Sequence, residues 1–256
     1  MSSTNGQRAD RPRRRSGVAG PAVRGAGRAA APPAGEIEPA AGPPAGETGP
    51  AGDWPSAGAA GDPQAPPTTK ERFLYAGAEL FGRQGFTGTG MKQIVAAAQA
   101  PFGSLYHHFP GGKEQLGEEV IRIAGGMYGQ LVAAIVDEHA DLATGIEEAF
   151  RLAGVHLADS GWADACPIAT MTLETANASE AMRTASHEVF EAWFAQLVER
   201  FEAVGIDAAR ARPLAIATLS LLEGAFLFAR AARTTEALDA AGRQAADAVR
   251  AALAAA

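Results

Sequence analysis

Cysteine is almost absent from this 256-residue chain, which contains Cys166 and no other. A single cysteine excludes an intramolecular disulfide framework and a zinc site built from cysteines alone. The chain also lacks an uninterrupted apolar run of ~18 residues, so we expect no membrane-spanning helix. No apolar run follows the arginines at positions 13–15, so we expect no secretory signal and a cytoplasmic location.

Proline is scarce after residue 68, because residues 1–68 hold 12 of the 16 prolines together with 12 of the 30 glycines. A segment of this composition buries too little apolar surface to offset the entropy lost on ordering. The sequence therefore predicts a disordered Pro/Gly/Ala-rich tail over residues 1–67. Seven arginines at positions 8–28 can contact phosphates without sequence preference, but a solvated, dispensable tail or an upstream start codon chosen in error is the simpler explanation.

Positive charge is also scarce overall, since the chain carries a formal net charge of −7. The charge is unevenly distributed: residues 70–113 hold five basic and two acidic side chains, whereas residues 114–256 hold ten arginines and 21 acids. A small basic region therefore precedes a large acidic one. This asymmetry favours contact between the first region and a polyanion.

Strand-like alternation is missing after residue 68, and apolar residues recur at helical spacing instead. The sequence predicts an all-α fold. The expected helices cover residues 69–84, 91–98, 102–109, 113–139, 142–159, 166–178, 179–204, 207–231 and 235–254.

The three short helices within residues 70–113 have the layout of a helix-turn-helix with a supporting first helix. Leu105 and Phe109 give the third helix an inward face, which leaves its other side free for a DNA groove. Lys113 stands at a helix start, where free N–H groups favour a phosphate. The candidate groove-facing residues are Ser104, Tyr106, His107 and His108.

Other interpretations of these residues fit less well. A phosphate-binding loop ending in Gly111-Gly112-Lys113 needs a glycine at His107 and a hydroxyl residue at Glu114. Adjacent helical histidines diverge by ~100°, so His107 and His108 lack the spacing of a metal chelate, and we expect no metal or cofactor. Cys166 is most simply a small buried hydrophobe, although a redox role stays open.

One segment resembles a known family. Phe86-Thr87, Thr89, Ile94 and the run from Gly103 through Ser104-Leu105-Tyr106-His107-His108-Phe109-Pro110 to Lys113-Glu114 are similar to the DNA-binding domain of TetR-family transcriptional repressors. The acidic helical remainder resembles that family's ligand-binding and dimerisation domain. The Phe-Pro-Gly-Gly-Lys loop, Cys166-Pro167 and Leu222-Glu223-Gly224-Ala225 are similar to the LmrA/YxaF-like subgroup.

The resemblance implies roles for individual residues. Tyr106 and Lys113 would contact phosphates, Ser104, His107 and His108 would lie near the groove, and Thr87 and Thr89 would cap or contact the backbone around the second helix. Two residues depart from the family pattern. Gln99 replaces a turn glycine, at a cost of ~1 kcal/mol if φ must be positive. Phe102 replaces a lysine, so one phosphate contact is missing.

The acidic region contains a helix, residues 213–230, that is apolar on nearly all sides. Such a helix needs cover on all sides, which suggests a partner chain and a four-helix interface with the last helix. The alternative is a helix in the core of a monomer. The predicted dimer contacts are Leu219, Leu222, Phe226, Val249 and Leu253.

Aromatic residues, methionine and a few polar groups in the central helices are what a small-molecule pocket requires, although each of them also fits a simple core. Glu174 is a carboxylate within a mostly apolar stretch, where a buried charge needs a partner. The predicted ligand contacts are Phe150, His156, Trp162, Met171, Glu174, Phe190, Trp193 and Phe194.

Together these features predict a ligand-responsive repressor that binds a palindromic operator as a homodimer and is released by a small lipophilic effector. Its expected parts are a tail at 1–67, a DNA-binding domain at 68–114 and a ligand-binding and dimerisation domain at 115–256. Two alternatives stay open: a constitutive DNA-binding protein without an effector, and a helical enzyme that uses Cys166 and His156. The effector, the operator and the direction of regulation are not specified by the sequence.

Overall fold

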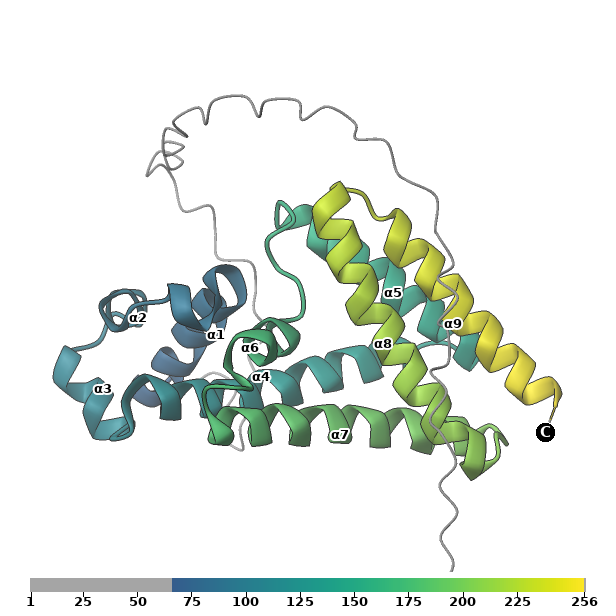
Figure 1. Ribbon diagram of the computed structural model, residues 1–256, viewed down its shortest axis with the longest axis horizontal. Coiled ribbons are helices and arrows are strands. Elements are labelled where there is room, and N and C mark those ends of the chain that lie inside the picture. The colour runs from purple at the N-terminus through teal and green to yellow at the C-terminus, as the bar shows by residue number, and fades with distance from the viewer. Residues whose placement is uncertain (1–65, 256) are drawn as a thin grey trace, which may run out of the picture. The chain divides into compact units, whose positions relative to one another are not determined.

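The computed structural model describes residues 66–255, and within this range the chain forms nine α-helices and no strand (Figure 1). The predicted tail lies outside the described residues except for its last two positions. The all-α fold class is confirmed, and the predicted helices are found with their ends shifted by a few residues. The helices are α1 (Thr69–Gly88), α2 (Met91–Ala97), α3 (Phe102–His108), α4 (Gly112–Asp137), α5 (Leu142–Asp159), α6 (Pro167–Thr175), α7 (Glu180–Ala203), α8 (Ala208–Ala232) and α9 (Glu236–Ala254).

Helix α1 begins at a capping box. The backbone N–H of Glu71 donates to the Thr68 hydroxyl at 3.3 Å, and the Thr68 N–H donates to the Glu71 carboxylate at 2.7 Å. These two bonds satisfy N–H groups that the first helical turn leaves without partners. Gly85 interrupts the helix with φ of 76°, at the position where the apolar pattern predicted its end.

The turn between α2 and α3 contains Gln99 with φ of 49°, a left-handed conformation that favours glycine. The guanidinium of Arg72 donates to the Gln99 carbonyl at 3.0 Å and thereby ties this turn to α1. Helix α3 then ends before Pro110, as expected from the lost amide donor and the restriction that proline places on Phe109.

Two hydrophobic cores hold the described helices together. The first joins α1–α3 to α4, α6 and the start of α7 through buried residues that include Phe73, Phe81, Phe109, Ile168 and Met182. The helix-turn-helix therefore shares its core with the helices that follow it. A shift of α6 therefore also changes the packing around α1.

The second core lies among α5, α8 and α9 and reaches the ends of α4 and α7. Figure 1 shows α4 and α7 running side by side, with α8 crossing them and α9 lying beside α5 and α8. Small residues permit this close packing: a Cβ added to Gly125 of α4 would lie 2.4 Å from Val189 of α7. This bundle contains the pocket described below.

Two described helices, α4 and α8, are long and apolar enough by length and composition to cross a membrane. In the most apolar window of α4, 39% is buried inside the structure, and in that of α8 the share is 22%. The expectation of no membrane-spanning helix rested on the lack of an uninterrupted apolar run, and scattered polar residues do interrupt the apolar runs of both helices. Both helices pack against other helices of the bundle, and core helices of soluble proteins pass the same test.

Candidate DNA-binding face and ligand pocket

The outer side of α3 carries the residues expected at a DNA groove. Leu105 and Phe109 are fully buried, whereas Tyr106 is 49% exposed and His107 is exposed beside it. Ser104 and His108 are partly exposed at the edges of the same side. The structure therefore brings Ser104, Tyr106, His107 and His108 together on one surface, as predicted, and a hydrophobic anchor holds that surface in place.

Thr87 and Thr89 lie in different environments. Thr89 is 1% exposed, and its hydroxyl donates to the carbonyls of Gly85 at 2.8 Å and Leu80 at 3.2 Å. This geometry makes Thr89 a cap on the end of α1, so it has no free hydroxyl for a phosphate. Thr87 is exposed, and its backbone N–H donates to the Glu174 carboxylate at 2.8 Å.

Lys113 lies next to Phe86, with its ammonium 4.3 Å from the ring centroid. Burial lowers the pKa of Lys113, and the nearby charge of Glu174 opposes this effect. A cation over an aromatic face is stabilised by the ring quadrupole, so this contact holds Lys113 against the protein. A phosphate contact requires this side chain to turn outward.

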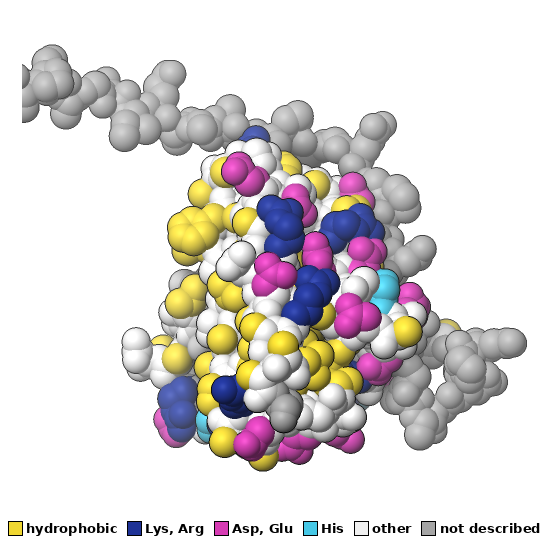
Figure 2. All heavy atoms as spheres, turned by 90° about the vertical axis from the view of Figure 1, so that its right-hand side faces the viewer, with side chains coloured by type: hydrophobic (Ala, Val, Ile, Leu, Met, Phe, Trp, Pro, Cys, Tyr) yellow, Lys and Arg dark blue, Asp and Glu magenta, His cyan; other side chains and the backbone are white. Residues whose placement is uncertain are grey.

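The surface shown in Figure 2 carries Lys/Arg and Asp/Glu side chains interspersed with hydrophobic ones. A surface of mixed charge lacks the continuous positive potential that binds phosphates. Near α3, Lys92 is exposed. On α1, Lys70 pairs with Glu119, Arg83 pairs with Asp164, and Arg72 donates to the Gln99 carbonyl. The face around α2 and α3 is therefore the better candidate for DNA.

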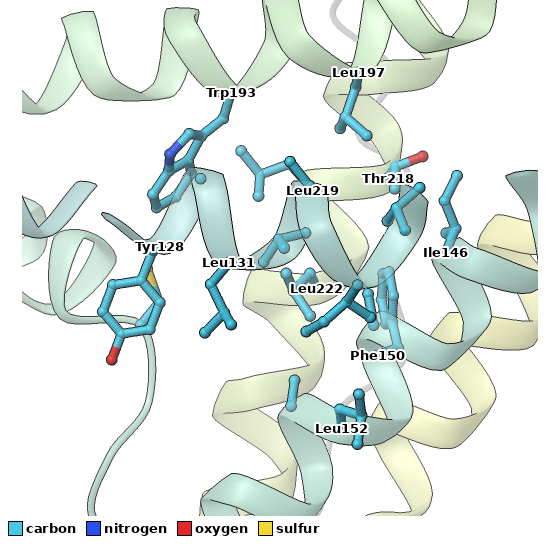
Figure 3. A pocket seen from close by; sticks show the side chains of 18 of the residues that line it. Tyr128, Leu131, Ile146, Phe150, Leu152, Trp193, Leu197, Thr218, Leu219 and Leu222 are labelled. Atoms are coloured by element: carbon cyan, nitrogen blue, oxygen red, sulfur yellow. The ribbon is translucent and has the colours of Figure 1, made fainter. Parts of the chain in front are cut away.

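A cavity of about 290 Å³ lies within the helical bundle between α4, α5, α7 and α8. Figure 3 shows Leu219 and Leu222 of α8 at its centre, with Trp193 and Tyr128 to one side and Phe150 to the other. The Trp193 indole N–H donates to the Gly125 carbonyl at 2.8 Å, which fixes the ring in the wall. This is an apolar site of a size that suits a small organic molecule.

The polar groups of the cavity are few, and the acidic ones lie near the start of α6. Cys166 is the N-cap of α6, and its sulfur accepts the Ala169 N–H at 3.4 Å. Burial raises the pKa of the Cys166 thiol well above its usual value, and the Glu223 carboxylate raises it further. Such a cysteine stays protonated and is a poor nucleophile, which argues against the enzyme alternative.

Three predicted ligand contacts line the cavity, namely Phe150, His156 and Trp193. Glu174 was expected within an apolar stretch but is exposed and faces α1, because the exposed side of the short helix α6 carries it. Met171 is fully buried in the first core. The predicted residues that lie outside the cavity lining are Trp162, Met171, Glu174, Phe190 and Phe194.

The predicted dimer contacts lie in several environments within the bundle. Leu219, Leu222 and Phe226 line the cavity, Val249 is fully buried in the second core, and Leu253 packs against that core. Leu219 and Val249 are buried, whereas Leu222, Phe226 and Leu253 are partly exposed, so the part they play in a dimer stays a prediction. The large apolar side chains of α8 that are exposed are Ile216, Leu221, Leu227 and Phe228.

Sequence reasoning missed Thr218, Glu223 and Tyr128 as cavity residues. Glu223 is the one acidic residue of α8 and lies among apolar neighbours, and this signal in the sequence could have identified it. Thr218 and Tyr128 gave no such signal, because a threonine or tyrosine is unremarkable in a helix that packs against others.

Comparison with known proteins gives a consistent picture. Residues 73–120 match the description "Bacterial regulatory proteins, tetR family", and residues 143–244 match "Transcriptional regulator LmrA/YxaF-like, C-terminal domain". The HTH-type transcriptional regulator LmrA of Bacillus subtilis is 31% identical over 65% of this chain and 89% of its own length. The regulator MT0206 of Mycobacterium tuberculosis is 33% identical over 68% of this chain and 91% of its own.

Solved structures show the same fold. The regulatory protein TetR of Rhodobacter sphaeroides aligns with a TM-score of 0.62 at 24% identity, over 70% of this chain and 97% of its own. The reduced form of NemR from Escherichia coli aligns with a TM-score of 0.61 at 24% identity, over 69% of this chain and 94% of its own.

The fold and the α3 surface define a helix-turn-helix transcriptional regulator. The chain belongs to the TetR family, with a C-terminal region of the LmrA/YxaF-like type.

Proposed function

We propose that this protein is a homodimeric repressor that binds a palindromic operator in the cytoplasm and releases it when a lipophilic effector occupies the cavity. The observation that carries the proposal is the position of the cavity. The segment Asp164–Cys166 forms part of its wall, and the same segment leads directly into α6, which packs against α1.

Two contacts connect the cavity wall to the helix-turn-helix. Arg83 of α1 pairs with Asp164 at 3.4 Å, and Thr87 donates its N–H to Glu174 of α6 at 2.8 Å. A ligand that displaces the Asp164–Cys166 segment changes both contacts. Effector binding then favours a state in which α3 is wrongly placed for DNA, and the coupling equals the difference in ligand affinity between the two states.

The exposed apolar face of α8 supports the dimer. Leu227 and Phe228 are 67% and 65% exposed, and these large side chains lie next to each other near the end of the helix. A patch of this kind marks a protein interface more often than a free surface. A two-fold dimer places two copies of α3 in major grooves ~34 Å or a multiple apart, which requires a palindromic site.

The proposal is tested by selecting fragments of the source genome and random duplexes with the purified full chain at physiological salt. We expect an enriched palindrome whose half-sites are separated by about one helical turn or a multiple of it. Equal affinity for selected and random DNA would instead favour a constitutive, non-specific DNA-binding protein.

The selected duplex then serves to test release. Lipophilic compounds are added to the complex, and fluorescence anisotropy of labelled DNA measures its dissociation. We expect release by compounds that bind the DNA-free protein. If compounds bind the protein without weakening the complex, then the sensing half of the proposal is wrong.

A further inference from the structure

Glu223 is the most unusual group in the cavity. It extends from α8 into an apolar site and interacts there with the Cys166 thiol. Burial raises the pKa of Glu223 to about 7, while the hydrogen bond with Cys166 lowers it by a smaller amount. A carboxylate that loses water without gaining a cation is poised to bind one.

The other charged and titratable groups of the cavity do not supply that cation. Arg200 holds Asp137 through two hydrogen bonds of 2.6 and 2.8 Å, so its charge is matched at the rim. Asp164 adds a second carboxylate. The remaining titratable groups of the lining are Tyr128, His156 and Cys166.

The walls suit a positive group with a large apolar body. Aromatic rings from three helices besides α8 line the cavity, and their faces attract cations as well as apolar surface. The rings belong to Tyr128, Phe150, Trp193 and Phe226. An ion with a strongly hydrated head and no apolar body gains nothing from such walls.

Thr218 marks a second polar point in the cavity. Its side chain is 5% exposed overall, and its hydroxyl has no hydrogen-bond partner in the described structure. Thr218 and Glu223 are five residues apart on α8, or ~7.5 Å along the helix axis. A buried hydroxyl without a partner is destabilising, and a hydrogen bond with a ligand oxygen or nitrogen offsets that cost.

We propose that the cavity binds a lipophilic cation whose positive group pairs with Glu223 and whose body extends along the aromatic walls toward the Thr218 hydroxyl. The inference rests on the proposed function, in which this cavity is the effector site. Beyond that function, the inference states that the effector is positively charged and that Glu223 selects for this charge.

Three probes with the same alkyl chain test the charge selectivity: decyltrimethylammonium, 1-decanol and decanoate, each below its micelle concentration. Isothermal titration of the DNA-free full chain measures their affinities. We expect decyltrimethylammonium to bind at least about tenfold more tightly than the other two. Its affinity falls about tenfold from pH 8 to pH 6, because protonation of Glu223 competes with the cation.

Variants assign the effect to one carboxylate. Glu223→Gln lowers the affinity for decyltrimethylammonium by at least about tenfold and removes its pH dependence, whereas Glu223→Asp keeps the pH dependence. Glu191→Gln is the matched control, because Glu191 pairs with Arg212 away from the cavity. Urea unfolding of each variant verifies that it is folded.

The inference is overturned if 1-decanol or decanoate binds as tightly as the cation, if Glu223→Gln leaves the cation affinity unchanged, or if no probe binds. Operator release separates it from the proposed function. If the cation binds through Glu223 without releasing DNA, then the cavity selects cations but is no effector site. If 1-decanol releases DNA and the cation does not, then the effector role stands and the charge assignment fails.

Discussion

At the scale of single residues, Gln99 holds a backbone conformation that its side chain disfavours. Its φ of 49° costs about 1–2 kcal/mol for a residue with a Cβ. The hydrogen bond from Arg72 to the Gln99 carbonyl holds this conformation and orients the chain from α2 into α3. The strain is thus located beside the candidate DNA-binding face of α3.

Gln99→Gly should raise the free energy of unfolding by about 0.5–1 kcal/mol, since relief of the left-handed strain exceeds the added entropy of the unfolded chain. The Arg72 bond is retained because it goes to the backbone. Urea unfolding at fixed protein concentration measures the change. Ala100→Gly is the control and should lower stability, because Ala100 has no positive φ. A loss of stability in Gln99→Gly would show that the turn is unstrained.

Glu223 also affects stability as a function of pH. Its pKa is about 7 in the folded protein against an ordinary value of 4.5 for a glutamate side chain, so the folded state holds this proton more tightly than the unfolded state. The contribution of Glu223 to stability therefore falls as pH rises from about 4.5 to about 7. The free energy of unfolding of Glu223→Gln, relative to that of the parent chain, should increase by up to about 3 kcal/mol across this range.

The measurement is the difference between the free energies of unfolding of parent and variant at each pH. Taking this difference cancels the contributions of the other titrating groups. Glu191→Gln is the control, because the hydrogen bond from Arg212 lowers the pKa of Glu191 and predicts no growth of that sign. Parallel curves for Glu223→Gln and the parent would contradict an elevated pKa.

At the scale of elements, α6 fits against α1 at a position where α1 has no side chain. A Cβ on Gly85 would lie 1.8 Å from a Glu174 oxygen, and the φ of 76° at Gly85 is itself unfavourable for other residues. The same Glu174 carboxylate accepts the Thr87 N–H. The contact between α1 and α6 therefore depends on this glycine.

Gly85→Ala should lower the free energy of unfolding by about 1–3 kcal/mol, because it adds both a clash and a strained backbone. Gly82→Ala on the same helix is a matched control with the opposite sign. Its Cβ would meet Pro167 at an ordinary 3.7 Å, and alanine favours the helix by about 0.5–1 kcal/mol. Thermal and urea unfolding compare the two. Equal effects would mean that Gly85 tolerates a side chain.

At the scale of the whole molecule, different parts of the described surface have different proposed roles. In the proposed function the α3 face attracts phosphates, whereas the acidic helices that follow disfavour contact with DNA. The proposed dimer surface is the exposed apolar side of α8, whose large side chains lie between Ile216 and Phe228. The proposal therefore assigns operator binding and dimerisation to separate surfaces.

Phe228→Glu should shift the protein from dimer to monomer at micromolar concentration, because a carboxylate is costly to bury in an apolar interface. Sedimentation velocity measures the change. Leu173→Glu is the control, since Leu173 is 86% exposed but lies on α6. Dimers that persist in Phe228→Glu, or monomers in both variants, would show that this face of α8 is not the interface.

The sequence by itself determined the helices, the helix-turn-helix and the side of α3 that faces outward. These features follow from local chemistry: the capping box at Thr68, the glycine at position 85, the proline after Phe109 and the inward pair Leu105 and Phe109. Each acts within a few residues of its own position, so the sequence pattern is sufficient to find it.

Only the tertiary structure decided which face of α8 looks inward and which carboxylate enters the cavity. The sequence showed α8 as apolar on nearly all sides, so its pattern distinguished no face, and the packing of α4, α5 and α7 made the choice. Glu174 and Glu223 are both carboxylates among apolar residues in the sequence, so the pattern did not show which of them enters the cavity. Glu174 lies on the exposed side of the short helix α6 and faces α1, whereas Glu223 lines the cavity between α4, α5, α7 and α8.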